Sequence, residues 1–336
     1  MGKHDLPPQE VLRQFPLGWA EHWVPLPSGY SDACLWKNPS AKLVLKASLA
    51  TSLTLGQLND IRTWVDFTQA QGFHLLPQLI PTSNFQAGYE YQNRVWFLMS
   101  EMPGEPDLSK ATMATGVQQI AEQLARLHAI WKSRFETCGP FPGVRRRMKI
   151  LSTAEEIFST FGQMIPHSTR SVSEDVRSWL IRLYLFLPSL VPVAVRQLES
   201  LQRLTVPIQP CLCDCWYRNF LFEDTQLTGL IDLDAMKLDH PSVDLARILG
   251  SLFPDHPAKW SEFFSYYQNG PGAPLVDPEW VRKLDFSGTV CAGLYWMRRL
   301  LLDNPSSGHS EQVHSKIEEI LRRLSRPLIS FGDPII

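Results

Sequence analysis

The chain has 336 residues, of which 44% are apolar and 20% are charged, and its formal net charge is −2. This composition is typical of a globular protein, and the length is sufficient for two lobes with substantial cores. The near-neutral charge balance creates no bulk field for nucleic acid or an anionic membrane, so we expect neither as a partner.

The N-terminal sequence and the apolar stretches predict a cytoplasmic protein. The start, MGKHDLPPQE, has no apolar signal core, and Leu6 stands where an acylation signal needs Ser or Thr. The longest apolar stretch, residues 183–195, is shorter than a membrane span and contains Pro188 and Pro192. We expect a kinked pair of core helices there. The six cysteines, without a secretion signal, are expected to be free thiols.

The first hundred residues predict a small antiparallel sheet with one helix. The helical pattern has Leu58, Ile61 and Val65 on one face and is expected to stop at Gly72. The expected elements are strands at residues 21–26, 33–36 and 42–46, a helix at 55–71, and strands at 76–81 and 95–99. Three strands, a helix and two strands do not suit a parallel βαβ sheet.

The remainder of the chain predicts a mainly helical lobe with a small β-patch. Met102, Pro103 and Gly104 are expected to form a hinge before it. The expected helices are at residues 116–132, 154–161, 174–187, 243–253, 278–302 and 311–324, and the expected strands are at 207–212, 220–222 and 227–230. We therefore predict an α+β fold with a small antiparallel-sheet lobe at residues 1–102 and a larger helical lobe at residues 103–336. A cleft between two lobes is a natural place for a ligand.

Residues 211–250 carry the side chains with recognisable chemistry. Asp214 and Asn219 lie on an expected loop, and Asp232 follows the apolar run at residues 227–231. Phosphoryl transfer needs a divalent metal against the phosphates and one group that orients the attacking hydroxyl. Magnesium prefers a few protein oxygen ligands completed by phosphate and water. An Asn carbonyl and an Asp carboxylate brought together by a hairpin, with a separate Asp as base, supply this set at the spacing of kinase catalytic and metal loops.

This segment resembles the aminoglycoside phosphotransferase and choline kinase group of the protein-kinase-like superfamily. That group reads His-Gly-Asp-x-x-x-x-Asn, then an apolar strand ending in Ile-Asp, then Pro-x-x-Asp-Leu-Ala. The chain matches it, in order, with Leu212-Cys213-Asp214 and Asn219, with Gly229-Leu230-Ile231-Asp232, and with Pro241-Ser242-Val243-Asp244-Leu245-Ala246. The resemblance implies a two-lobed protein-kinase-like fold, with a nucleotide-binding lobe at residues 1–102 and a catalytic, acceptor-binding lobe at residues 103–336. ATP and Mg²⁺ are the cofactors that it implies.

The resemblance also implies a role for each matching residue. Asp214 is expected to be the catalytic base, and Asn219 and Asp232 are expected to bind magnesium. Asp244 is expected to brace the catalytic loop from the start of its helix. As isolated features, the same residues could be ordinary loop and helix-cap residues.

Two positions before Asp214 depart from the pattern of the group. Leu212 replaces the His that supports the catalytic loop. Cys213 replaces the Gly, so we expect the backbone to avoid a conformation reserved for glycine. These departures keep two alternatives open, a weakened kinase and a nucleotide-binding pseudokinase that acts through a partner. A protein kinase is a third alternative, but the chain has no Ala-Pro-Glu element and little length between Asp234 and Pro241 for a peptide-binding segment.

Lys46 is the expected phosphate lysine. It ends the strand-like run at residues 42–46 and resembles the lysine that holds the α- and β-phosphates, with Lys42 as the weaker candidate. A solvated lysine at a strand end is the alternative. A kinase lysine pairs with an acid on the following helix, where Asp60 is better placed than Asp66. A plain exposed helix acid is the alternative for either residue.

Backbone groups of two further segments are expected to contact ATP. The turn at residues 27–32 occupies the phosphate-loop position, so amides near Gly29 and Ser31 are expected to approach phosphate, unless the turn is an ordinary hairpin. The run at residues 97–102 is expected to connect the lobes. Its contacts with the adenine edge are expected at Ser100, Glu101 and Met102.

Taken together, these features predict an ATP-dependent O-phosphotransferase that transfers the γ-phosphate to a hydroxyl of a small molecule. The acceptor is not identified by the sequence, because fold-level analogy supplies no substrate. Its pocket is expected to come from helical segments at residues 134–199 and 255–302, with Trp216 of the catalytic loop as a further lining residue.

Overall fold

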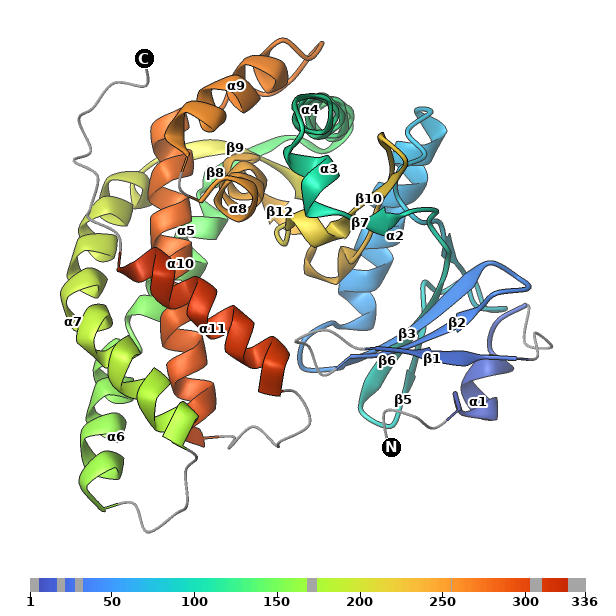
Figure 1. Ribbon diagram of the computed structural model, residues 1–336. Coiled ribbons are helices and arrows are strands. Elements are labelled where there is room, and N and C mark those ends of the chain that lie inside the picture. The colour runs from blue at the N-terminus through green and yellow to red at the C-terminus, as the bar shows by residue number, and fades with distance from the viewer. Residues whose placement is uncertain are drawn as a thin grey trace. The chain divides into compact units, whose positions relative to one another are not determined.

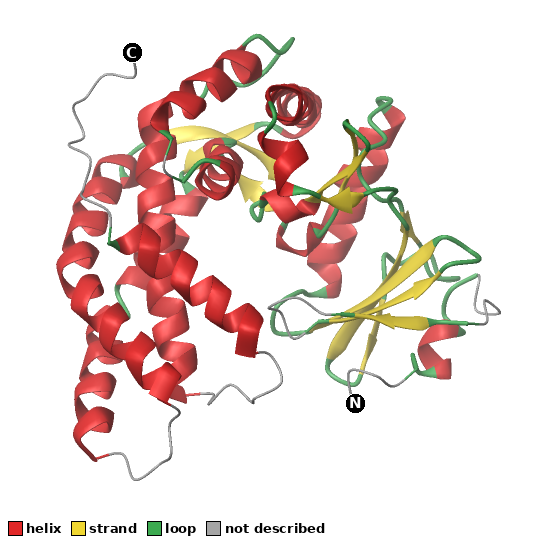
Figure 2. Cartoon of the chain, in the orientation of Figure 1, coloured by secondary structure: helices red, strands yellow, loops and turns green. Residues whose placement is uncertain are grey.

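The computed structural model describes residues 6–16, 22–27, 33–167, 174–254, 256–302 and 310–325. The fold is α+β, with antiparallel strands in the N-terminal part and mainly helices in the C-terminal part (Figures 1 and 2). The chain divides into two compact units. The first contains residues 1–136, 209–238 and 263–274, and the second contains residues 137–208, 239–262 and 275–336. The lobe boundary at residue 102 stays a prediction.

A six-stranded sheet forms the body of the first unit. Its order is β1-β2-β3-β6-β4, with β5 also paired to β6, and every pairing is antiparallel, as predicted. The indoles of Trp36 and Trp96 stack in its core with ring centroids 5.3 Å apart. The strands are β1 (Val24–Leu26), β2 (Cys34–Asn38), β3 (Leu43–Leu49), β4 (Leu79–Ile80), β5 (Tyr89–Tyr91) and β6 (Arg94–Ser100), and a short helix α1 (Gln9–Leu12) precedes them.

Helix α2 (Leu55–Ala70) has the boundaries that its sequence signals predict. Its N-terminus is a capping box. The Thr54 hydroxyl accepts from the Gln57 N–H at 3.2 Å, and the Gln57 Oε1 accepts from the Thr54 N–H at 2.9 Å. Its C-terminus is followed by Gly72, whose φ is +76°. The predicted apolar face is buried.

The segment after β6 leads into the small β-patch that carries the candidate site. Strand β7 (Glu105–Pro106) pairs with β10 (Phe220–Glu223), which forms a hairpin with β11 (Gln226–Leu230). Gly104 has φ +91°, and a Cβ there would lie 2.9 Å from the Phe222 backbone, so only glycine fits. Also in this unit are α3 (Leu108–Thr112), α4 (Ala114–Phe135) and the 3₁₀ turns η1 (Tyr217–Asn219) and η2 (Leu233–Ala235).

The second unit is mainly helical. Helices α7 and α10 pack side by side within it (Figure 1). The helices are α5 (Pro142–Leu151), α6 (Ala154–His167), α7 (Glu174–Gln202), α8 (Ser242–Leu252), α10 (Pro278–Leu302) and α11 (Ser310–Leu324). Strand β8 (Thr137–Pro140) pairs with the first part of β9 (Thr205–Cys211). Strand β12 (Lys237–Asp239) and helix α9 (Pro257–Gln268) lie where the chain crosses between the units.

The prediction of a kinked helix pair near residues 183–195 is wrong. The segment belongs to a single helix, α7, which contains both Pro188 and Pro192. The two prolines are four residues apart and exposed, so water can satisfy the carbonyls that lose a donor. Helix α7 is long and apolar enough to cross a membrane, but the core helix of a soluble protein can meet the same two criteria. Its buried residues, among them Leu183 and Leu187, form one stripe.

Replacement of the α2 cap tests the sequence basis of this helix. Thr54→Ala removes the hydroxyl that accepts from Gln57, and we expect a loss of about 1 kcal/mol in unfolding free energy. Thr54→Ser keeps the acceptor and is the matched control, expected to stay close to wild type. Thermal or denaturant unfolding measures both. Equal destabilisation by the two variants would contradict the capping assignment.

Candidate active site

The hairpin β10–β11 brings the two predicted magnesium ligands to its open end. Asn219 directly precedes β10, and the backbone N–H of Ile231 donates to the Asn219 carbonyl over 2.9 Å. Asp232 is the next residue, so its position beside Asn219 is set by the strand pairing. Its backbone is left-handed, with φ +65° and ψ +64°. A non-glycine residue in this conformation is uncommon and clusters at functional sites.

The loop at residues 214–219, which was predicted to be the catalytic loop, is closed by hydrogen bonds onto the backbone carbonyl of Asp214. The backbone N–H of Trp216 and the Nδ2 of Asn219 both donate to this oxygen at 2.8 Å. Because the amide nitrogen of Asn219 is used inside the loop, its Oδ1 is the atom available to a cation. An amide oxygen and the carboxylate of Asp232 are hard oxygen donors, which fit Mg²⁺. The Asp214 side chain is partly exposed.

Lys46 lies at the centre of a cluster with two carboxylates. Its side chain is 7% exposed, and its Nζ is 2.6 Å from Oδ1 of Asp232 and 3.0 Å from Oδ1 of Asp234. Ser48 follows two residues later on β3 and therefore on the same face, and its hydroxyl donates to Oδ2 of Asp234 over 2.5 Å. The cluster joins strand β3 to the loop that follows β11.

The carboxylates keep Lys46 charged despite its burial. Burial alone would lower the pKa of the ammonium group, but Asp234 and Asp232 outweigh it and raise the pKa above its ordinary value. The folded-state pKa therefore exceeds the unfolded one. The stability from this pairing is fully present below the unfolded lysine pKa and is lost only as the pH rises through the folded one.

Helix α2 does not supply the acid that was expected to pair with Lys46. Asp60 is exposed, and Asp66 pairs with Arg62 at 3.3 Å. The ion-pair partners of Lys46 come instead from the loop after β11. The sequence prediction missed Ser48 and the pairing of Asp234 with Lys46. The available signal was the i, i+2 spacing of Lys46 and Ser48, which places both side chains on one face of a strand.

Cys213 adopts the glycine-like backbone that it was expected to avoid. Its φ is +61°, within the left-handed region. That expectation is therefore wrong, and the loop keeps this shape without the glycine. A β-carbon in this region costs about 1–2 kcal/mol. The hydrogen bonds onto the Asp214 carbonyl fix the following residues and can offset such a cost.

The segment after β6 has one backbone donor suited to a ligand. The Ser100 N–H donates to the Gln78 carbonyl over 2.9 Å, and the Glu101 N–H donates to the Lys42 carbonyl over 2.8 Å. For Met102, no backbone carbonyl among the described residues accepts a hydrogen bond from its backbone N–H. Among the three residues predicted to meet adenine, Met102 is therefore the one that can donate a backbone hydrogen bond.

Three other predicted residues belong to the second unit or fall outside the described chain. Gly29 and Ser31 fall outside the described residues, so their approach to phosphate stays a prediction. Asp244 is fully buried in the first turn of α8, in the second unit. Its predicted support of the catalytic loop is not tested by this position.

The catalytic loop also presents an arginine over two aromatic rings. The guanidinium of Arg218 lies 5.0 Å from the ring centroid of Trp216 and 5.8 Å from that of Tyr217. The Arg218 Nε donates to the Tyr217 hydroxyl over 3.1 Å. Arg218 is exposed and directly precedes Asn219, so a positive charge lies at the edge of the candidate site.

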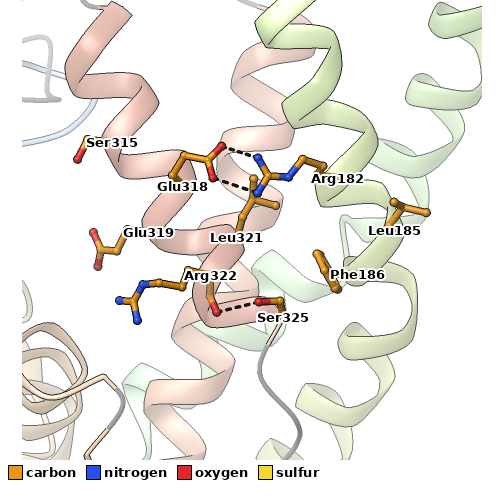
Figure 3. Close-up of a pocket in the computed structure, with 9 residues that line it drawn as sticks. All are labelled: Arg182, Leu185, Phe186, Ser315, Glu318, Glu319, Leu321, Arg322 and Ser325. Atoms are coloured by element: carbon orange, nitrogen blue, oxygen red, sulfur yellow. Dashed lines mark hydrogen bonds and ion pairs between the residues drawn. The ribbon is translucent and has the colours of Figure 1, made fainter.

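A pocket of about 730 Å³ lies between α7 and α11 of the second unit (Figure 3). Leu185, Phe186 and Leu321 contribute its apolar wall, and Arg182 pairs with Glu318 at 2.5 and 3.0 Å. None of the predicted site residues lines this pocket. It is therefore not the predicted ATP site.

Comparisons with known proteins agree with the resemblance seen in the sequence. A family profile described as the phosphotransferase enzyme family matches residues 22–284. A comparison with curated proteins gave no significant match.

Similar solved structures share the fold at low identity. A spectinomycin phosphotransferase in complex with ADP and spectinomycin is 13% identical, with a TM-score of 0.62 and coverage of 90% of this chain and 92% of that one. An amicoumacin kinase in complex with AMP-PNP and Ca²⁺ is 12% identical, with a TM-score of 0.57 and coverage of 90% and 89%. A choline/ethanolamine kinase family protein from Mesorhizobium loti is 14% identical, with a TM-score of 0.52 and coverage of 96% and 95%.

The strain at Cys213 can be measured with a pair of variants. Cys213→Ala removes the thiol and keeps a β-carbon, whereas Cys213→Gly removes both. We expect the glycine variant to be the more stable of the two by about 1 kcal/mol in unfolding free energy, because only glycine is unstrained at φ +61°. Denaturant unfolding compares them directly. A more stable alanine variant would show that the left-handed backbone is not strained here.

Proposed function

Because the chain belongs to the phosphotransferase enzyme family, we propose that it is an ATP-dependent kinase that phosphorylates a hydroxyl of a small molecule. The observation that carries the proposal is the meeting of three expected parts in one unit. Lys46 is the expected phosphate lysine, and Asp232 and Asn219 are the expected metal ligands. Asn219 lies on the same loop as Asp214, the expected base. A chance set of loop acids would have no reason to converge on a buried lysine of a distant strand.

In the proposed reaction Lys46 and the hairpin hold the phosphates. Asn219 Oδ1 and the carboxylate of Asp232 would hold Mg²⁺, which neutralises phosphate charge when it is bound. One N–H of the Lys46 ammonium would turn from Asp232 toward the phosphates. A compact ammonium group acts on them as a point charge. The Met102 N–H would donate to the adenine edge. These contacts place the nucleotide without covalent chemistry.

Asp214 would act on the acceptor. Asp214 is partly exposed, and its backbone carbonyl accepts two hydrogen bonds, so the backbone that carries the carboxylate is anchored. It would accept a hydrogen bond from the acceptor hydroxyl, align the oxygen with the γ-phosphorus and take up the proton. In-line transfer follows from this alignment.

The acceptor class rests on the family. The solved neighbours that bind spectinomycin or glucosamine support a small hydroxylated molecule as the acceptor.

Variants of the base and the metal ligand separate catalysis from binding. Asp214→Asn should abolish phosphoryl transfer and leave ATP affinity near wild type, because the change affects only the acceptor side. Asp232→Asn should remove the magnesium-dependent part of ATP affinity. Calorimetry with and without Mg²⁺ measures binding, and ATP consumption over aminoglycosides, amino alcohols, sugars and nucleosides measures turnover.

The same experiment decides between the kinase and the pseudokinase. Wild-type protein that binds Mg²⁺·ATP but does not consume ATP with any acceptor tested would support a nucleotide-binding protein that acts through a partner. Asp232→Asn with unchanged magnesium-dependent binding would contradict the metal assignment. Wild-type protein without nucleotide binding would contradict both readings.

A further inference from the structure

We propose that Ser48 and Asp234 form a fixed brace that positions Lys46 for the phosphates, in place of an acid on helix α2. The inference rests on the proposed nucleotide-binding function and adds two positioning residues to it. It concerns how the Lys46 side chain is positioned before and during nucleotide binding, and it does not concern the phosphoryl-transfer step.

A buried ammonium needs a partner that stays with it. Lys46 is 7% exposed, and an unpaired charge at that depth costs several kcal/mol. The acids of α2 do not fill this role, since Asp60 is exposed and Asp66 pairs with Arg62. The partner must therefore be Asp232 or Asp234.

The two acids differ in how they are held. Both carboxylate oxygens of Asp234 point to β3, with Oδ1 on Lys46 and Oδ2 on the Ser48 hydroxyl. Asp232 meets β3 through Oδ1 only, its side chain is 44% exposed against 22% for Asp234, and it follows the hairpin beside Asn219. Asp232 is thus the acid that can turn to a metal, and Asp234 is the acid that stays.

Ser48 is what makes Asp234 a fixed partner. Ser48 is 4% exposed, and its hydroxyl donates a charge-assisted hydrogen bond of 2.5 Å to the carboxylate of Asp234. Without this bond the carboxylate of Asp234 could rotate away from Lys46. With it, Lys46 keeps one carboxylate while its other N–H donors turn from Asp232 to the phosphates.

A different role for Asp234, as a second metal ligand, makes a different prediction. A metal ligand affects nucleotide affinity only when metal is present. A brace on Lys46 affects affinity with or without metal, because the lysine contacts phosphate in both cases. Nucleotide binding in EDTA therefore separates the two roles.

The first test uses Ser48→Ala, which changes no charge. We expect ADP and ATP to bind about tenfold more weakly than to wild type, both in EDTA and in Mg²⁺, and Ser48→Thr to recover most of the loss because it keeps the hydroxyl. Ser287→Ala deletes another buried hydroxyl, one bonded to backbone in the second unit, and should leave affinity unchanged. Calorimetry measures the dissociation constants.

The second test needs no nucleotide. A small active ester acylates accessible amines, and peptide mass spectrometry gives its rate at Lys46. All proteins in this test carry Asp232→Asn, so that Asp234 is the remaining carboxylate partner of Lys46. We expect slow labelling in this background and about tenfold faster labelling when Ser48→Ala or Asp234→Asn is added. Addition of Ser287→Ala should leave the labelling rate unchanged.

The outcomes separate this inference from the proposed function. Unchanged Lys46 labelling in both Ser48→Ala and Asp234→Asn overturns the brace, whether or not the protein binds ATP. A loss of affinity in Mg²⁺ but not in EDTA also overturns it, in favour of a metal ligand. Faster labelling in a protein whose wild type binds no nucleotide supports the brace and refutes the ATP site.

Discussion

The ammonium group of Lys46 between two carboxylates is the interaction on which the candidate site depends. It joins strand β3 to a loop 186 residues later in the chain. Removing a charge from water costs several kcal/mol per ion unless it is paired and hydrogen-bonded, so Lys46 is tolerable at this depth only with Asp232 and Asp234 nearby. The cluster therefore fixes where the loop after β11 meets the sheet, and through the β10–β11 hairpin it also fixes Asn219.

Much of this arrangement was predictable because its parts are local in sequence. The α2 helix has a capping box at one end and Gly72 at the other, which define its limits before any packing is known. Asn219 and Asp232 flank a hairpin whose strands have clear β-character, so their proximity follows from antiparallel pairing. Family spacing then supplied chemical roles that periodicity alone could not.

The parts that sequence reasoning missed depend on long-range packing or on local rules that packing overrides. Asp60 was chosen by analogy with a helix acid, but the pairing of Lys46 is decided by which carboxylates reach it across the fold. Pro188 and Pro192 suggested a break, yet both lie on the exposed side of α7, where water can replace the missing donors. In each case the deciding fact was a side chain's surroundings, which a single sequence does not contain.

The loop at residues 212–219 closes through hydrogen bonds although it departs from the family motif at Leu212 and Cys213. Cys213 keeps a left-handed backbone although glycine is absent, and Asn219 still closes the loop onto the Asp214 carbonyl. Hydrogen bonds from residues that follow Asp214 in the chain therefore help to set the loop shape. Leu212, which is buried and has no side-chain donor, cannot reproduce the polar support of a histidine. Leu212 therefore changes which polar groups can support this loop, whereas Cys213 keeps a backbone conformation that glycine readily adopts.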